Sequence, residues 1–319
     1  MNPVLLAGLI ALVFSYALTP VVRLLANRWG IVAHPGGRRV HTRPMPLMGG
    51  LAMFAGFAAA VGAVIALRPE LGLDEQTQGI LIGCALVAFV GVLDDKFELP
   101  GWVQAASILA GGLVLAAYGV EIRYITNPFK GGHLMPLGAL SIPLTLLWVL
   151  MVTKAVDCMD GLDGLAAGIS AIAACTLMLM AMAAGSRFTM SGVMAAALMG
   201  AALGFLRFNY PPAGVFMGTV GAQFLGFALA GISVAGAFKI ATLVAVAAPV
   251  LVLSVPLFDT TFVVLKRAVN GRKIHEADTS HLHHRLVSKG LSHRQTIWII
   301  YALTIASCAI AYVLFSLVK

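Results

Sequence analysis

The sequence predicts an all-α polytopic membrane protein with about ten transmembrane helices. Of its 319 residues, 60% are hydrophobic and 11% are charged, whereas an average soluble domain carries roughly 25% charged residues. Apolar runs close to the roughly 20 residues that cross a bilayer recur along the whole chain. Ordinary globular packing cannot hide this much apolar surface, so the helices are expected to lie in a membrane.

The expected transmembrane helices follow one another with short polar connections. They are predicted near residues 3–24, 45–67, 78–93, 101–120, 140–156, 164–184, 190–206, 220–236, 240–265 and 295–317. Several of these runs are short, so their boundaries are expected to differ by a few residues. No soluble domain, low-complexity tract or clear internal repeat interrupts the series, which predicts a single integral-membrane domain over residues 1–319.

The distribution of basic residues predicts the orientation. Five arginines come at or after the end of the first apolar run: Arg23, Arg28, Arg38, Arg39 and Arg43. Cytoplasmic loops carry an excess of lysine and arginine, so the first loop is expected inside and the N-terminus outside. Alternation then leaves six of the 21 basic residues on the outer side: Arg68, Arg123, Lys130, Arg187, Lys239 and Lys319. The longest outer connection, residues 121–139, is expected to form a small hairpin.

The net charge bears on the expected partners, and the positions of the cysteines bear on their expected role. The net charge of +8 fits a membrane surface that faces anionic lipid. Nucleic acid is not an expected partner, because no basic patch with interleaved aromatic residues occurs. The four cysteines lie in or beside apolar runs without a C-x-x-C pair, so they are expected to be small core residues.

The first polar motif, residues 38–50, reads Arg-Arg-Val-His-Thr-Arg-Pro-Met-Pro-Leu-Met-Gly-Gly. Arg38, His41 and Arg43 precede a Gly-Gly pair at the expected start of a helix. A helix N-terminus offers free N–H groups to an anion, which allows a binding site, although this motif alone does not favour one. The alternative is a basic anchor at the membrane surface, followed by glycines that pack two helices together.

The second motif is Asp94-Asp95, directly after an apolar run. Adjacent carboxylates suit a catalytic base or a magnesium site, since Mg²⁺ prefers hard oxygen ligands. The alternative is a solvated turn that caps the following helix.

The third motif is a cluster of aspartates, Asp157, Asp160 and Asp163, between two long apolar runs. Carboxylates this close repel one another unless a cation or a proton neutralises them. At helical spacing they would fan over about 120° of one face and look into one cavity. Gly161 and Gly164 would let the backbone approach a ligand. The alternative is a polar loop whose aspartates cap the next helix.

The fourth motif lies in the basic loop 266–294. His281, His283, His284 and Arg285 are candidates for charge-assisted hydrogen bonds to a diphosphate. A zinc site is the alternative, although no cysteine lies close by in sequence and the carboxylates favour Mg²⁺. A merely solvated basic loop is a further alternative.

Asp259 lies within the expected ninth helix. An acidic residue inside a membrane span is a functional candidate by default. The alternative, which we favour, is a structural role in hydrogen bonds to neighbouring helices.

Taken in order, these segments resemble the polyprenyl-phosphate N-acetylhexosamine-1-phosphate transferases. The resemblance covers nearly the whole chain. It rests on Arg38-Arg-Val-His41, Pro46-Leu-Met-Gly-Gly50, Asp94-Asp95, Asp160-Gly-Leu-Asp-Gly-Leu165, Asn209-Tyr-Pro-Pro-Ala213, Phe216-Met-Gly218, Pro256-Leu-Phe-Asp259 and His281-Leu-His-His284.

The resemblance implies a reaction and its location. Undecaprenyl phosphate would attack a UDP-sugar, with UDP-N-acetylglucosamine the expected donor, and UMP would leave. Mg²⁺ is the implied cofactor, with Mn²⁺ as a possible substitute. The reaction would be the first membrane step of a cell-envelope glycan pathway, such as lipopolysaccharide or teichoic acid synthesis. It would take place at the cytoplasmic face of a bacterial inner membrane, and a homodimer is plausible.

The resemblance also implies residue roles. Catalytic roles fall to Asp94, Asp95 and Asp160, metal binding to Asp157 and Asp160, and substrate binding to Arg38, His41, Arg43, Lys154, Asp163, His281, His283, His284 and Arg285. An aspartate of the Asp94-Asp95 pair would take the proton of the lipid phosphate or orient that phosphate.

The chain departs from the family pattern at two places. The family commonly has Asn-Ala-x-Asn where this chain has Lys154-Ala-Val-Asp157, and a metal-binding aspartate where it has Thr219. Either Asp157 takes over part of the metal site, or the protein is a weakly active or inactive relative. The intact remaining motifs favour the first explanation. A cation-coupled transporter is a less favoured alternative, because the polar motifs cluster on one face and paired broken helices are not evident.

Overall fold

The computed structural model describes residues 1–34, 44–126, 134–185, 189–237, 249–270 and 281–318. The predicted anion-binding residues Arg38, His41 and Arg43 lie outside these ranges, so their roles stay predictions.

The described chain is an all-α bundle, as predicted, and it also contains two small β-hairpins. Within the described residues, eight helices are long and apolar enough to cross a membrane, and α4 is apolar but shorter. The helices of the bundle are α1 (Pro3–Arg28), α2 (Gly49–Leu67), α3 (Glu75–Phe97), α4 (Gly101–Ala117), α5 (Ser141–Cys158), α6 (Leu165–Ala184), α7 (Thr189–Asn209), α8 (Gly218–Ala237) and α12 (His293–Val318). The chain is therefore a multi-pass membrane protein.

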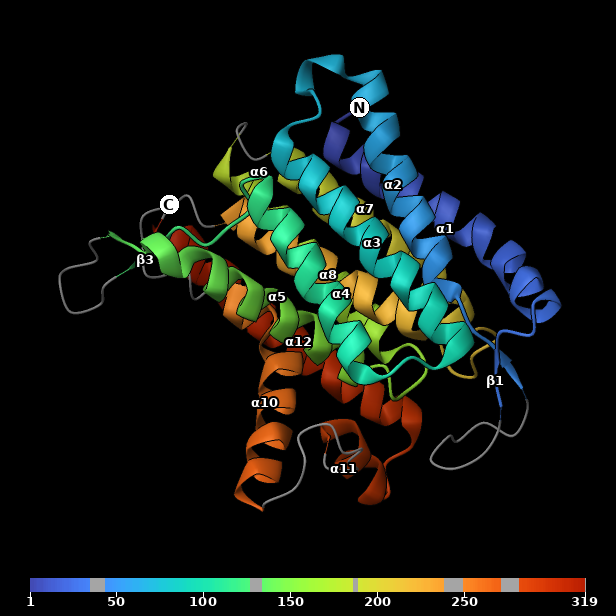
Figure 1. The fold of residues 1–319 in the computed structure, drawn as a ribbon. Coiled ribbons are helices and arrows are strands. Elements are labelled where there is room, and N and C mark those ends of the chain that lie inside the picture. Colours follow the sequence, from blue (N-terminus) through green and yellow to red (C-terminus); the bar gives the residue numbers. More distant parts are fainter. Residues whose placement is uncertain (35–43, 127–133, 186–188, 238–248, 271–280, 319) are drawn as a thin grey trace.

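The ninth predicted span, residues 240–265, has different boundaries from those expected. Its described part includes helix α10 (Ser254–Val269), which continues past residue 265 and projects from one end of the bundle beside α11 (Leu282–Ser288) (Figure 1). One side of α10 is exposed and apolar over successive turns, a pattern that suits a lipid-facing surface. That side carries Phe258, Phe262, Leu265 and Val269.

Helix α8 forms the centre of the bundle, and its neighbours include α3, α5 and α6. Small residues allow two backbones to approach closely, as is common where membrane helices cross. A Cβ atom added to Gly50 of α2 would overlap the backbone of Gly221 in α8, and one added to Gly200 of α7 would overlap that of Gly8 in α1. The first contact holds α2 directly against α8, and the second holds α7 directly against α1.

The hairpins lie at opposite ends of the bundle. Strand β1 (Val32–Ala33) pairs with β2 (Met45–Pro46), and β3 (Tyr124–Thr126) pairs antiparallel with β4 (Leu134–Pro136). The second pair confirms the hairpin expected within residues 121–139. Figure 1 shows β3 at one end and β1 with α11 at the other.

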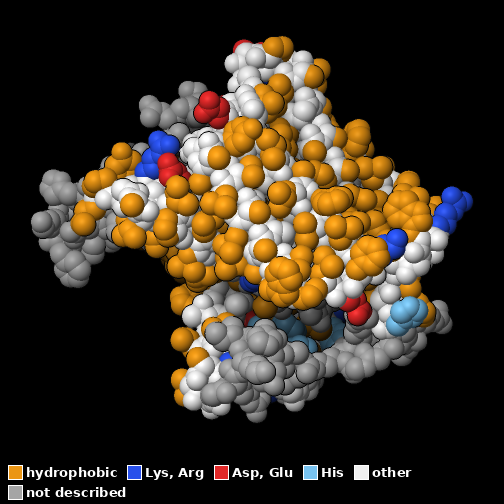
Figure 2. All heavy atoms as spheres, in the orientation of Figure 1, with side chains coloured by type: hydrophobic (Ala, Val, Ile, Leu, Met, Phe, Trp, Pro, Cys, Tyr) orange, Lys and Arg blue, Asp and Glu red, His pale blue; other side chains and the backbone are white. Residues whose placement is uncertain are grey.

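Apolar side chains cover most of the face shown in Figure 2, and acidic and histidine side chains are visible at its lower end. Exposed large hydrophobic residues occur along many of the helices, including α1, α3, α5 and α12. This surface is suited to a bilayer, because exposing apolar side chains to water costs free energy and contact with lipid does not.

Candidate active site in a polar cavity

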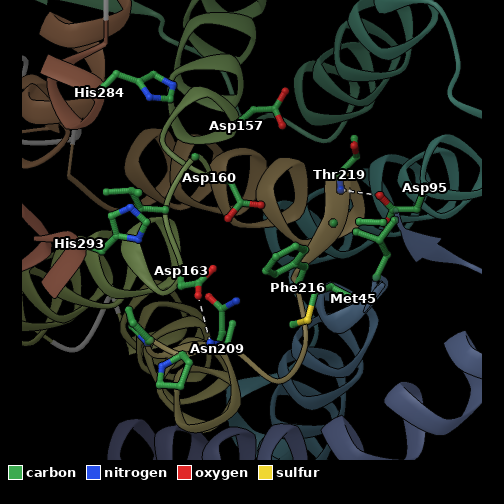
Figure 3. Close-up of a pocket in the computed structure, with 18 of the residues that line it drawn as sticks. Met45, Asp95, Asp157, Asp160, Asp163, Asn209, Phe216, Thr219, His284 and His293 are labelled. Carbon is green, nitrogen blue, oxygen red and sulfur yellow. Dashed lines mark hydrogen bonds between the residues drawn. The ribbon is translucent and has the colours of Figure 1, made fainter. Parts of the chain in front are cut away.

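A cavity of about 1250 Å³ opens at the end of the bundle that carries β1 and α11. All five connections predicted on the cytoplasmic side contribute residues to its lining. The acidic residues of the lining are Asp94, Asp95, Glu98, Asp157, Asp160 and Asp163, and the basic ones are His284, His293 and Arg294. Figure 3 shows Asp157, Asp160 and Asp163 around the cavity, with His284 and His293 on the opposite side from Asp95.

Asp94 and Asp95 lie in the last turn of α3, and neither belongs to a solvated turn. Asp94 is buried, and its Oδ1 accepts a hydrogen bond of 2.9 Å from Gln104 Nε2. Asp95 Oδ1 accepts one of 2.7 Å from the backbone N–H of Thr219. Asp95 Oδ2 is buried and has no hydrogen-bond partner among the described residues. The carboxylate of Asp95 is therefore fixed by one hydrogen bond, and its second oxygen has no partner among the described residues.

Asp157, Asp160 and Asp163 do line one cavity, but not by the predicted helical spacing. Helix α5 ends at Cys158, and residues 159–164 form turns before α6 begins at Leu165. The turns, which contain two glycines, bring the carboxylates together. Asp157 Oδ2 lies 2.9 Å from Lys154 Nζ. The metal-binding role of Asp157 stays a prediction.

The loop 159–164 is clamped by contacts from three other segments. Gly164 adopts a φ of 78°, which favours glycine. Its N–H donates to Asn209 Oδ1 at 2.8 Å, and its carbonyl accepts from Tyr301 Oη at 2.7 Å. Asp163 Oδ2 accepts from the N–H of Ala213 at 3.0 Å. Gly164 is thus held by Asn209 and Tyr301, and its predicted approach to a ligand stays a prediction.

His283 packs against the same loop. It is 1% exposed, and a Cβ atom on Gly161 would overlap its ring. Burial, followed by the neighbouring His284 and His281, lowers the pKa of His283 to about 4. The ring packs against Gly161, and neither ring nitrogen has a hydrogen-bond partner among the described residues, so the substrate-binding role of His283 stays a prediction.

The remaining residues of the histidine motif have separate surroundings. His281 Nδ1 lies 2.8 Å from Asp259 Oδ2, and Asp259 Oδ1 accepts from the N–H of Leu282 at 2.7 Å. Asp259 therefore anchors the start of α11, which is the structural role we favoured. Arg285 lies over the ring of Phe262. Of the motif, His284 is the residue that lines the cavity.

The Gly-Gly pair does not offer free N–H groups, which corrects the anion-binding interpretation. Gly49 N–H donates to Phe216 O at 3.0 Å, and Gly50 N–H donates to Met217 O at 2.9 Å. The alternative of helix packing is confirmed by the contact between Gly50 and Gly221. The Gly-Gly pair thereby holds Phe216 and Met217 in place, directly before Thr219, whose N–H donates to Asp95.

Known bacterial proteins are similar in sequence to this chain over most of its length. Residues 77–237 match the family described as glycosyl transferase family 4. The chain belongs to glycosyl transferase family 4. One relative is the probable undecaprenyl-phosphate N-acetylglucosaminyl 1-phosphate transferase of Bacillus subtilis (strain 168), which is 36% identical over 93% of this chain and 81% of that protein.

Two further relatives come from other bacteria. The decaprenyl-phosphate N-acetylglucosaminephosphotransferase of Mycobacterium tuberculosis (strain H37Rv) is 34% identical over 93% of this chain and 78% of its own length. The undecaprenyl-phosphate alpha-N-acetylglucosaminyl 1-phosphate transferase of Escherichia coli (strain K12) is 26% identical over 91% of this chain and 77% of its own length.

Several residues of this family 4 site were not predicted from the sequence. Gln104, His293 and Arg294 line the cavity. Gln104 lies in a predicted apolar helix, where its isolated amide was a signal that we did not use. His293 and Arg294 were counted as part of a basic loop, although they begin the last helix. Asn209 belonged to a quoted motif without an assigned role.

The donor atoms of the family 4 cavity fit a magnesium ion. The unpartnered Oδ2 of Asp95 and the carboxylate of Asp160 are hard oxygen ligands. Among the described residues, no three acidic, histidine or cysteine side chains are grouped closely enough to hold a metal ion by themselves. Mg²⁺ usually binds one or two carboxylates and completes its shell with water and substrate phosphates. The arrangement therefore fits an ion held jointly by protein and substrate.

Asp160 is expected to lower stability at neutral pH. Burial, followed by the charges of Asp157, Asp95 and Asp163, raises the pKa of Asp160 well above its ordinary value. A raised pKa contributes stability at low pH, and this stability is lost as pH rises through the folded-state pKa.

We therefore expect Asp160→Asn to raise the unfolding temperature by a few degrees at about pH 8, and much less at about pH 4. Thermal unfolding of the detergent-solubilised protein without divalent cations measures both values. An equal shift at the two pH values would show that the charge of Asp160 is not the cause.

Proposed function

We propose that the chain transfers N-acetylglucosamine 1-phosphate from UDP-N-acetylglucosamine to undecaprenyl phosphate and releases UMP. The observation that carries the proposal is the convergence of five separated polar segments on one cavity at the end of a membrane bundle. The names of the family 4 relatives support the acceptor and the sugar phosphate. The apolar bundle supplies a surface for the prenyl chain.

The acidic side of the cavity suits the acceptor phosphate. An oxygen of the lipid phosphate attacks the β-phosphorus of the UDP-sugar, and the bond from that phosphorus to UMP breaks. Asp95, held by Thr219 N–H with one oxygen unused, takes the proton of the lipid phosphate or orients it. Bound Mg²⁺ would neutralise charge on the diphosphate and on departing UMP. Asp160 would hold the ion together with water and the substrate phosphates, and a metal-binding role of Asp157 is a separate prediction from the sequence.

The basic side suits the diphosphate of the donor. His284, His293 and Arg294 line this side, and Arg294 Nη2 donates to Pro211 O at 3.0 Å. An arginine can hold a phosphate through charge-assisted hydrogen bonds. Asn209 and Asp163 fix the neighbouring loops through their bonds to Gly164 and Ala213.

We expect Arg294→Met to raise the KM for UDP-N-acetylglucosamine about tenfold with a smaller effect on kcat, because ground-state contacts to the diphosphate are lost. Arg28→Met is the matched control, because Arg28 is an exposed arginine at the end of α1 and does not line the cavity. Steady-state kinetics of UMP release measure both variants. An unchanged KM in Arg294→Met would remove Arg294 from the proposed binding site.

The location follows from the charge bias. The bundle end that carries the cavity is the one predicted in the cytoplasm of a bacterial inner membrane, where UDP-sugars are available. Labelling of single cysteines from either side of sealed vesicles tests this orientation.

The test of the function is direct. Purified protein receives undecaprenyl phosphate, Mg²⁺ and a panel of UDP-sugars, and UMP release is measured beside an active family member. We expect release with UDP-N-acetylglucosamine. Release with none of the sugars would reject the proposal and favour the altered or inactive relative that Thr219 suggests. Solute uptake by vesicles without UMP release would instead favour a transporter.

A further inference from the structure

Lys154 lies beside the acidic side of the cavity, near the C-terminal end of α5. Its Nζ atom is 2.9 Å from Asp157 Oδ2 and 2.5 Å from Gln104 Oε1. The side chain is 29% exposed. Among the described residues, no other lysine or arginine forms an ion pair with a carboxylate that lines the cavity. The ammonium group thus contacts two residues that line the cavity, Gln104 and Asp157.

Gln104 extends this contact to the catalytic pair. Its Oε1 accepts from Lys154 Nζ and, at 3.1 Å, from Gln223 Nε2, while its Nε2 donates to Asp94 Oδ1 at 2.9 Å. Rotating the amide by half a turn would place its NH₂ group against two donors and its oxygen against a carboxylate. The three contacts therefore fix one orientation, in which Lys154 holds Asp157 directly and Asp94 through Gln104.

We propose that the ammonium group of Lys154 is a resident cation of the active site. It neutralises part of the acidic wall, takes Asp157 as its counter-ion, and positions Asp94 through Gln104. Lys154 is thus a positioning residue. The inference deepens the proposed function, on which it rests for the identity of the substrates.

The consequence concerns the divalent cation. A cation placed on the acidic wall would be repelled by the fixed ammonium group, and such repulsion is strong where solvent is partly excluded. The diphosphate of the donor adds negative charge, which offsets the repulsion. The free protein is therefore expected to bind divalent cations weakly, and the ion to enter together with the nucleotide sugar.

The experiment titrates Mn²⁺ alone into the purified full-length protein in lipid nanodiscs, and electron paramagnetic resonance measures the free ion. We expect Lys154→Met to tighten Mn²⁺ binding about tenfold, because the repelling charge is lost while the length of the side chain is kept. Lys154→Arg keeps the charge and is expected to bind like wild type. Lys96→Met makes the same charge change nearby at an exposed lysine outside the cavity lining, and is also expected to bind like wild type.

A double variant separates the counter-ion role of Asp157 from its predicted role as a metal ligand. Lys154→Asn with Asp157→Asn removes one positive and one negative charge, so the net charge of the wall is unchanged. If Asp157 is the counter-ion, the double variant is expected to bind Mn²⁺ within about threefold of wild type. If Asp157 is itself a ligand, binding is lost.

Tighter binding in Lys154→Met, with wild-type binding in the arginine and double variants, supports the proposal. Unchanged or weaker binding in Lys154→Met overturns it, as does loss of binding in the double variant or undetectable binding in every variant. Monodisperse gel filtration and an unfolding temperature near that of wild type confirm that each variant is folded. The titration contains neither substrate, so it tests the role of Lys154 independently of the reaction. If the expected Mn²⁺ binding is found but no UMP is released, the proposed function is rejected and the role of Lys154 stands.

Discussion

Replacement of Asp95 by asparagine is expected to lower the rate of sugar-phosphate transfer by about 10²–10⁴-fold, the usual contribution of a positioned acid or base. Asparagine keeps the size of the side chain, and its Oδ1 can still accept the hydrogen bond from Thr219 N–H. What it loses is the negative charge and the unpartnered Oδ2. The loss is therefore expected in kcat, with little change in the KM for the UDP-sugar.

The surroundings of Asp95 make this effect specific. The backbone of Gly218 adopts a φ of 71° and runs so close to Asp95 that a Cβ atom there would overlap the carboxylate. The N-terminus of α8, which carries Thr219 N–H, favours a negative charge at this point. An asparagine cannot make use of that field, although the shape of the site is preserved.

Glu75→Gln provides the matched control for Asp95→Asn. Glu75 is an exposed carboxylate at the opposite end of the same helix, so its neutralisation is expected to leave UMP release near the wild-type rate. Initial rates with undecaprenyl phosphate and UDP-N-acetylglucosamine measure both variants. Asp95→Asn activity within about threefold of wild type would exclude Asp95 as the group that handles the acceptor proton.

The membrane fold could be predicted because its signals are local. Hydropathy identifies each span from its own residues, and the bias of lysine and arginine assigns each connection to one side of the membrane. The five connections predicted on one side all reach the cavity. The ninth span ends later than residue 265, because α10 continues to Val269, and this difference is of the few residues that were expected.

The contacts within the site could not be predicted, because they join residues far apart in the chain. Anion binding was one of two interpretations of Gly49 and Gly50, yet their N–H groups meet carbonyl oxygens more than 160 positions away. His281 looked like a substrate ligand, yet its Nδ1 lies 2.8 Å from Asp259 Oδ2. A motif states which groups are present, but packing decides which of them are already satisfied.

The role of Thr219 shows the same limit. The missing carboxylate was visible in the sequence, but the backbone bond from Thr219 to Asp95 does not depend on the identity of its side chain. The pairing of Lys154 with Asp157 was one of the possibilities that the sequence offered, whereas its link through Gln104 to Asp94 required the structure.

Gly50→Ala is expected to destabilise the protein by at least about 1–3 kcal/mol, the usual cost of overpacking. The added Cβ atom would overlap backbone atoms of Gly221 and Val220 in α8, and a backbone cannot rotate away as a side chain can. Helix α2 would have to move, and the hydrogen bond from Gly50 N–H to Met217 O would weaken. Because Met217 leads directly to Thr219, we also expect lower activity in the folded fraction.

Gly62→Ala tests whether the cause is the close approach or the loss of a glycine as such. Gly62 lies in the same helix, is exposed, and has no heavy atom within 4 Å of an added Cβ beyond its own helix. Alanine is a better helix former than glycine by about 0.5–1 kcal/mol, so this variant is expected to be at least as stable as wild type. If the close approach of α2 and α8 requires a glycine at position 50, Gly50→Ala lowers the unfolding temperature in detergent and Gly62→Ala does not. Equal shifts would mean that α2 and α8 can separate without cost, and that Gly50 does not hold the segment carrying Thr219 against Asp95.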